Sequence, residues 1–250
     1  MKKLVVMMTL ALGAGSFGVA HAGIVGSVHD FSDNINVLGG NVAFDESSAT
    51  GWNGRKEICR VCHVPHDHAR ASQRYLNGLL WNHGVSSATY TMYDNTWSST
   101  LGGVQSAQPD GTAKLCLGCH DGSVGIDTFD KYVGGAVFAN NYSVDAKVTN
   151  FSDGANIDLR GTHPLSIKFP VGDTQFNDPS TQTWQGGGTV ASTLDNGKVQ
   201  CSTCHDVHNQ ESIATTHLLR AGQTVATGTA SGLCLTCHIK QYGCSALPWF

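Results

Sequence analysis

Apolar positions are scattered along the chain in short groups, and the only sustained run lies near the N-terminus. That run, residues 4–15, follows two lysines and precedes an Ala-His-Ala site that ends at residue 22. This order is typical of a secretory signal peptide, and the run is too short for a transmembrane helix, which needs about 20 apolar residues. We therefore expect residues 1–22 to be removed on export, and residues 23–250 to form a single domain.

Beyond the signal peptide, the pattern contains no long amphipathic helix and no sustained series of alternating strands. Residues 23–58 form a loose arm rich in Gly and Asn, and residues 123–200 form a long interval with Gly-, Thr- and Asn-rich turns. The elements that the pattern predicts are few and short. They are a helix from residue 57 to about residue 79, strands at Ala88–Tyr93, Ala136–Ala139 and Leu165–Phe169, a tight turn ending at Asp121-Gly122, and a helix from an N-cap at Ser231 through Lys240.

The composition indicates a folded chain without a large conventional core. Charged residues make up 14% of the sequence, against about 25% in ordinary globular domains. Five Trp, six Tyr and nine Phe argue against a disordered chain. The net charge of −4, with no basic stripe, argues against a nucleic-acid partner. The unusual features of the composition that remain to be explained are the nine cysteines and twelve histidines.

Eight of the nine cysteines belong to four copies of Cys-x-x-Cys-His, at residues 59–63, 116–120, 201–205 and 234–238. This is the attachment signature of c-type haem. Two thiols one helical turn apart can form thioethers to the two vinyl groups of one porphyrin, and the following His lies under the iron. A disulfide framework does not require a His after every second Cys. Zinc would use the Cys-x-x-Cys pairs and leave the His of each motif as a surplus ligand. A thioredoxin-like motif occurs once per domain, and here there are four copies. The four motifs predict four covalently bound haem c groups.

The motifs assign the first set of haem-binding residues. The thioether cysteines are Cys59, Cys62, Cys116, Cys119, Cys201, Cys204, Cys234 and Cys237. The proximal iron ligands are His63, His120, His205 and His238.

Seven more histidines follow the signal peptide, whereas Met92 is the only methionine there, so at most one iron can take a Met ligand. His66 follows His63 by three residues, and His208 follows His205 by three. On a helix each such pair shares a face, but two ligands of one iron approach from opposite faces. If His66 and His208 are ligands, each therefore reaches a haem other than that of its own motif, and the haems pack closely.

The order of the motifs and of the pieces between them resembles the OmcE-type tetrahaem c-type cytochromes, exported proteins that polymerise into extracellular electron-conducting filaments. The resemblance covers nearly all of the chain after the signal peptide. It is carried by Ser27-Val-His29-Asp30, Cys62-His63-Val-Pro-His66, Leu80-Trp81-Asn82, Tyr90-Thr-Met-Tyr93, Leu115-Cys-Leu-Gly-Cys-His120-Asp-Gly122, Thr162-His163-Pro164, Cys204-His205-Asp-Val-His208, Leu218-Leu-Arg220 and Leu233-Cys-Leu-Thr-Cys-His238.

This resemblance implies bis-histidine ligation at all four haems, with His29, His66, His163 and His208 as the distal ligands. In such filaments a His of the N-terminal arm can ligate a haem of the next subunit, and by that analogy His29 serves a neighbour. The expected fold class is a multihaem c-type cytochrome, mostly irregular, with short helices at the haem motifs and few short strands. The four haems would form much of the core, so the apoprotein should not fold.

Several residues have no assigned role in this scheme. His83 is either a spare ligand or a surface or propionate contact, and His68 and His217 are expected to be exposed polar positions. Cys244, the ninth cysteine, is either a free thiol or a partner in an intermolecular disulfide.

The sequence thus predicts an electron-transfer protein rather than an enzyme, because an iron with two histidines has no open position for substrate. The expected site of action is extracellular or on the outer cell surface, as a head-to-tail homopolymer that exchanges electrons with redox partners there. A soluble periplasmic shuttle, resembling small tetrahaem cytochromes c₃, is the alternative. A multihaem reductase would need a five-coordinate haem, and all four motifs end in His. No membrane span is expected.

Overall fold

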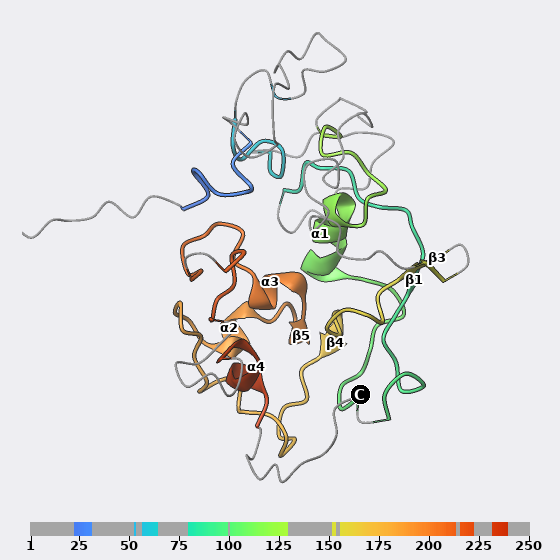
Figure 1. Ribbon diagram of the computed structural model, residues 1–250, viewed down its shortest axis with the longest axis vertical. Helices are drawn as coiled ribbons and strands as arrows, with labels where there is room; N and C mark the ends of the chain where they lie inside the picture. The colour runs from blue at the N-terminus through green and yellow to red at the C-terminus, as the bar shows by residue number, and fades with distance from the viewer. Residues whose placement is uncertain are drawn as a thin grey trace, which may run out of the picture.

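Short hydrogen-bonded segments joined by turns, rather than long helices or sheets, make up the chain (Figure 1). The computed structural model describes residues 23–31, 53, 57–64, 80–99, 101–129, 152–153, 156–213, 216–222 and 232–239. Their elements are β1 (Tyr90–Thr91), α1 (Gly111–His120), β2 (Ser152–Asp153), β3 (Asn156–Asp158), β4 (Ile167–Lys168), α2 (Val190–Thr193), β5 (Lys198–Val199), α3 (Cys201–Cys204) and α4 (Gly232–Cys237).

Two small sheets connect distant parts of the chain. In the first, β3 lies between β1 and β2, pairing parallel with β1 and antiparallel with β2, so that Ile157 is opposite both Tyr90 and Ser152. In the second, β4 and β5 pair antiparallel, with Ile167 opposite Val199. The second sheet leads directly into α3, because β5 ends two residues before Cys201.

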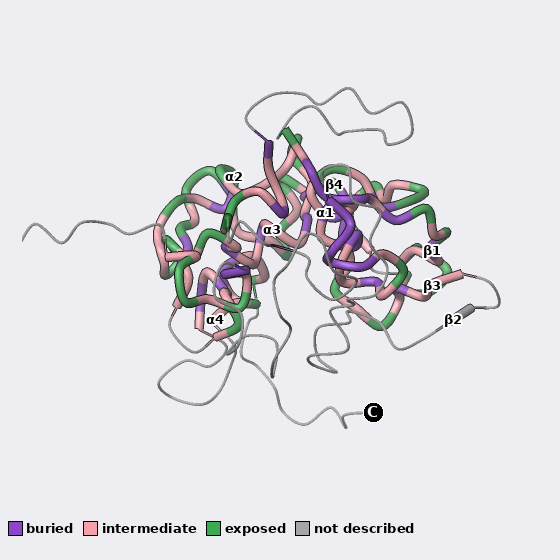
Figure 2. Tube along the Cα trace, turned by 90° about the horizontal axis from the view of Figure 1, so that it is seen from above, coloured by how far each residue is buried: buried purple, intermediate pink, exposed green. Residues whose placement is uncertain are grey.

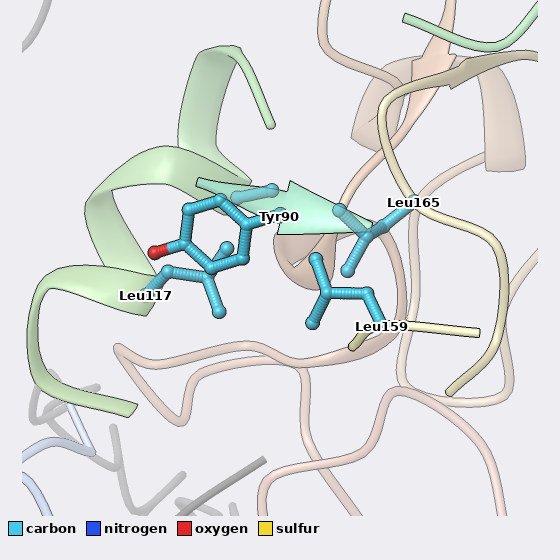
Figure 3. Close-up of a cluster of buried hydrophobic side chains, with 5 residues drawn as sticks. Tyr90, Leu117, Leu159 and Leu165 are labelled. Carbon is cyan, nitrogen blue, oxygen red and sulfur yellow. The ribbon is translucent and has the colours of Figure 1, made fainter. Parts of the chain in front are cut away.

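A first cluster of buried side chains joins β1 to α1 (Figure 3). Tyr90 of β1, Leu117 of α1, Leu159 and Leu165 pack together there with Ala113, and Cys201 lies against the cluster. Burial of an aliphatic side chain of this size is worth about 1.5–3 kcal/mol. The buried side of α1 is visible in Figure 2.

A second cluster lies beneath α4. Its buried members are Phe169, Trp184, Val190 and Ala221, and Cys237 packs against them. Each apolar cluster therefore supports a cysteine of a haem motif, which ties the position of the motif to the packing of the domain.

Polar side chains from distant segments hold the N-terminal end of α1. The backbone N–H of Thr112 donates to the Asp195 carboxylate at 3.0 Å, which satisfies one of the N–H groups that a helix start leaves unpaired. Asp110, the residue before α1, forms an ion pair with Lys198 and accepts a hydrogen bond from the Gln200 side chain at 2.8 Å. These contacts place α1 next to α3.

Several predicted elements are confirmed with narrower bounds. The strand expected at Ala88–Tyr93 contains β1, the strand expected at Leu165–Phe169 contains β4, and the helix expected from Ser231 through Lys240 contains α4. Residues 1–22 and the strand expected at Ala136–Ala139 lie outside the described residues, as do Ser231 and Lys240.

Three expectations about local structure are wrong. The helix expected from residue 57 is a series of turns as far as residue 64, and the remainder of its range lies outside the described residues. The second motif lies in α1, the longest helix among the described residues, and not in a tight turn, because Ala113, Lys114 and Leu115 before it favour a helix.

The third concerns the N-terminal arm. Residues 23–31 form turns that dock on the chain, with the Asn209 side chain donating to the Gly23 carbonyl at 2.7 Å. Asp30 and Phe31 at the end of this segment are buried. The segment is therefore part of the folded structure and not a loose arm.

The close approach of α1 to the backbone of Gly84 gives a first prediction. A methyl group at Gly118 would lie 2.6 Å from the Gly84 carbonyl oxygen, and backbone cannot move aside as a flexible side chain can. Helix propensity alone would make Ala more stable here by about 1 kcal/mol. We expect Gly118→Ala instead to lower the free energy of unfolding of the full chain by about 1–3 kcal/mol, as overpacking does.

Chemical denaturation measures this change, and Gly102→Ala is the control. The nearest atom to a methyl group at Gly102 is the free end of the Asp173 side chain, at 3.3 Å. The control should change the free energy of unfolding by less than about 0.5 kcal/mol. A Gly118→Ala variant more stable than the parent would contradict the packing described here.

Candidate functional site

Each haem motif is built as one turn of helix. The backbone N–H of the motif histidine donates to the carbonyl of the first cysteine four residues earlier, at 2.7 Å for His63, 3.0 Å for His205 and 2.9 Å for His238. In the second motif the same turn is the end of α1. The two cysteines of each motif are thus one turn apart, and all eight are free thiols.

In three of the motifs, a segment from elsewhere in the chain binds the backbone at the second cysteine. The carbonyl of the second cysteine accepts a hydrogen bond from Asn82 in the first motif, Arg220 in the third and Asn177 in the fourth, at 2.8–2.9 Å. Isolated bridges extend all three contacts, from His63 to Trp81, from His205 to Leu219 and from His238 to Phe176. We call the segments 80–84, 216–222 and 175–177 straps. They fix each motif from a distant part of the chain.

The motif thiols lie in a series, and burial shifts the pKa of several of them. Burial and the charge of Cys59 raise the pKa of Cys62 to about 12. Burial, followed by the charge of Cys62 and then that of Asp121, raises the pKa of Cys119 well above its usual range. The first and second motifs are therefore neighbours, and the thiols of Cys62 and Cys119 stay protonated at neutral pH.

The series continues through the other two motifs. The pKa of Cys201 is raised well above its usual range, chiefly by a hydrogen bond with Cys116 and then by burial. Burial raises the pKa of Cys204 to about 11, with further contributions from Cys201 and from Cys234 of the fourth motif. The motifs are neighbours in sequence order, and Figure 1 shows the same order, from residues 57–64 past α1 and α3 to α4.

Three motif histidines have a second histidine opposite them. The ring centres are 6.3 Å apart for His63 and His208, 6.0 Å for His120 and His29, and 6.3 Å for His238 and His163. The two members of each pair come from segments distant in sequence.

These separations match those of two imidazoles on opposite sides of one metal ion. With a metal–nitrogen distance of about 2.0–2.1 Å, the centres of two such rings are about 6.3 Å apart. The three predicted distal ligands that lie among the described residues, His29, His163 and His208, are the partners in these pairs. The donor set and its spacing fit haem iron.

His29 has two properties that suit a metal ligand. Its pKa is lowered to about 4, chiefly by burial and then by the positive charges of His120, His205 and His208. The ring is therefore neutral at neutral pH, which is the form that binds a metal. Its Nδ1 is buried and makes no hydrogen bond within the described part of the chain.

Two other rings have one nitrogen fixed by a carbonyl. His205 Nδ1 lies 2.9 Å from the His217 carbonyl oxygen, and His163 Nδ1 lies 2.9 Å from that of Pro164. Such contacts set the tautomer and leave Nε2 available to a metal. No second ring lies opposite His205 among the described residues. His66, the remaining predicted distal ligand, lies outside the described residues, and so do His68 and Cys244.

His217 is exposed, as predicted, but its backbone has a specific role. His217 and Leu218 both have left-handed backbone conformations, with φ of 55° and 63°. Residues with a side chain seldom adopt this conformation, and two in succession are strained. The turn brings the His217 carbonyl to the ring of His205.

His83 is buried within the fold, so the expectation that it could be a surface residue is wrong. It is 3% exposed, and burial is the main cause that lowers its pKa. Its Nδ1 lies 2.7 Å from the Gly84 carbonyl oxygen and its Nε2 lies 3.0 Å from that of Gly125. With both nitrogens engaged, the ring is not positioned as an iron ligand. It lies beside Cys119, whose Sγ is 3.4 Å from Nε2.

Two buried carboxylates complete the site and were not found by the sequence analysis. Asp121 and Asp206 each follow a motif histidine, and they are 2% and 6% exposed. Asp121 accepts a hydrogen bond from the Tyr90 hydroxyl at 2.5 Å and from the Ser123 N–H at 2.7 Å. The signal was present in the sequence, since Cys-His-Asp occurs in two of the four motifs.

Asp206 organises the loop that carries His208. Its carboxylate accepts hydrogen bonds from the backbone N–H groups of His208, Gln210 and Glu211, at 3.1, 2.7 and 2.7 Å. The Arg220 guanidinium lies 3.9 Å away and balances the charge. One side chain thus connects the third motif to His208, whose ring lies opposite that of His63 in the first motif.

In comparisons with known proteins, no family model and no curated protein matches the chain. None of the helices within the described ranges is long and apolar enough to cross a membrane.

The Asp206 loop gives the second prediction. In Asp206→Asn, one acceptor oxygen becomes an amide donor that faces backbone N–H groups, and Arg220 loses one of its two carboxylate neighbours, the other being Glu211. Leaving such buried groups unpaired costs about 1–3 kcal/mol. We therefore expect the free energy of unfolding of the full chain to fall by that amount.

Chemical denaturation of Asp178→Asn provides the control. Asp178 also caps a turn, accepting from the Ser180 N–H at 2.9 Å, but it is exposed to water. Equal losses of stability in the two variants would contradict the special role of the Asp206 carboxylate.

Proposed function

We propose that this chain is an electron-transfer protein that binds four haem c groups, with each iron held between two histidines. The observation that carries the proposal is the set of three ring pairs at 6.0–6.3 Å, each joining a motif histidine to a distant one. The two cysteines of each motif lie one turn apart, which supports covalent attachment at the same places. A bound haem supplies a reversible one-electron iron couple.

The pairs assign distal ligands to individual motifs. His208 serves the first motif, His29 the second and His163 the fourth, and His66 is left as the predicted ligand of the third, opposite His205. His208 follows the third motif but pairs with the first, so ligands cross between sites as the sequence analysis anticipated.

Two histidines per iron determine the chemistry that the protein supports. They occupy both axial positions, so substrate has no place to bind and electron transfer remains. Histidine in place of methionine keeps the potentials low. The protein is accordingly not an enzyme, and the straps and buried aspartates serve to hold the ligands rigidly.

The series of neighbouring motifs supports a route for electrons. Contacts between thiols link the first motif to the second, the second to the third, and the third to the fourth. Electrons would move along the four sites in sequence order, and the first and fourth sites would exchange electrons with partners.

For the protein's setting, we propose an exported polymer that forms an extracellular filament for long-range electron transfer. The support is the resemblance to the OmcE-type cytochromes and the signal peptide. In a filament, the segment 23–31 would leave its own chain and dock in the same way on the next subunit, with His29 ligating the neighbour's iron. Repetition of one such heterologous contact gives an open polymer.

One observation favours the soluble periplasmic shuttle as a second candidate. His29 lies against His120 of its own chain, and Asn209 holds the start of the same segment. The ligand pair of the second motif is therefore complete within one chain, and it needs no neighbour.

The ligand assignment gives the third prediction. The full chain, produced in a host that attaches haem c, should contain four haems and show only low-spin spectra. His163→Ala removes one distal ligand, so one haem in four should become high-spin and bind carbon monoxide when reduced. His217→Ala, which removes an exposed side chain, should stay fully low-spin. An unchanged spectrum of His163→Ala would refute its ligand role.

Electron microscopy of the haem-loaded protein gives the fourth prediction and separates the two settings. Micrometre filaments with a regular repeat are expected from the extracellular fraction, and His29→Ala should reduce them to small particles with one high-spin haem. Small particles alone from the unmodified protein would favour the shuttle. In that case His29→Ala would change the spectrum without changing the particle size.

A further inference from the structure

Trp81 has a buried hydrogen-bond donor with no acceptor. Its indole Nε1 is shielded from water and makes no hydrogen bond within the described part of the chain. A buried indole N–H normally finds a partner. Trp184 is an example, since its Nε1 donates to the Thr193 hydroxyl at 3.0 Å.

The unpaired donor lies beside a proposed haem ligand. The Trp81 ring stands at 90° to the ring of His63, with the centres 5.8 Å apart. The other unpaired buried ring nitrogen, Nδ1 of His29, lies beside His120. Both such nitrogens therefore accompany motif histidines.

The position of Trp81 is set by backbone contacts on both sides. Val64 N–H donates to the Leu80 carbonyl, and Asn82 N–H donates to the Cys62 carbonyl, both at 2.9 Å. The Asn82 side chain donates to the Arg60 carbonyl at 2.5 Å. These bonds fix the backbone on both sides of Trp81 and so hold its ring beside the first motif.

We propose that the Trp81 indole N–H donates a hydrogen bond to a propionate of the haem attached at Cys59 and Cys62. The inference rests on the proposed function, since it needs a haem at this motif. Propionate carboxylates are the hydrogen-bond acceptors of a haem, and an indole N–H can only donate. Trp81 thus binds the cofactor through its edge, in addition to the thioethers and the axial histidines.

The bond has a consequence for the charge near the iron. A donor to the propionate stabilises its ionised form and offsets part of the negative charge that favours oxidised iron. Without the donor, the propionate should hold its proton more tightly. At alkaline pH, where the carboxylate is ionised, the potential of this haem should fall.

The test compares Trp81→Phe with the parent, because Phe retains the ring that packs against His63 and lacks only the N–H. The acid dissociation constant of one haem propionate, read from the pH dependence of the four potentials, should fall about tenfold. In His208→Met, methionine replaces the distal ligand proposed for the first motif, so the potential of the haem at that motif should rise. The haem affected by Trp81→Phe should be this same haem. Trp97→Phe is the control, since Trp97 is 56% exposed and stacks on Arg160.

The outcomes separate this inference from the proposed function. Four low-spin haems with no change in any potential or its pH dependence in Trp81→Phe would overturn the role of Trp81 alone. If the variant does not mature, an experimental map of the haem-loaded parent decides. A Trp81 Nε1 beyond hydrogen-bond distance from every propionate oxygen would overturn the inference, and the absence of haem at Cys59 and Cys62 would overturn the proposed function.

Discussion

In the function proposed here, a motif histidine approaches an iron from one side only, and this constraint accounts for the arrangement of the chain. The turn that places His63 four residues after Cys59 holds its ring on one side of the motif. The second ligand would then come from elsewhere, as we propose for His208 at the first motif and for His29 at the second. Long-range ring pairs perform the task that strand pairing performs in a sheet protein.

The remaining structure holds these pairs in place with little regular secondary structure. Straps bind the carbonyl of the second cysteine, and the two apolar clusters support Cys201 and Cys237 from beneath. Asp206 gathers three backbone N–H groups and so shapes the loop of His208. Polar groups of this kind are costly to bury unless they are bonded, so the three hydrogen bonds to Asp206 show that the geometry of this loop is specified closely.

The sequence was most informative where chemistry fixes the spacing. The four motifs could be read from it, and the family resemblance pointed to His29, His163 and His208 as distal ligands, whereas the proximity of His208 to His63 depends on a fold that spacing does not reveal. The prediction of a loose arm was wrong at residues 23–31 because Gly23 is held by Asn209, a residue far away in the sequence. The role of Asp121 was missed because its partner, Tyr90, is equally remote. Local patterns predict turns and short strands, but not contacts between distant segments.

The order of the motifs in space has a consequence for how such a protein can change. Because neighbours in sequence are also neighbours in the fold, each motif is linked to those on either side of it, from Cys62 and Cys119 at one end to Cys204 and Cys234 at the other. A duplicated module added at either terminus would extend the series without rearranging its interior. The architecture is therefore suited to growth by gene duplication, with length as the property on which selection can act.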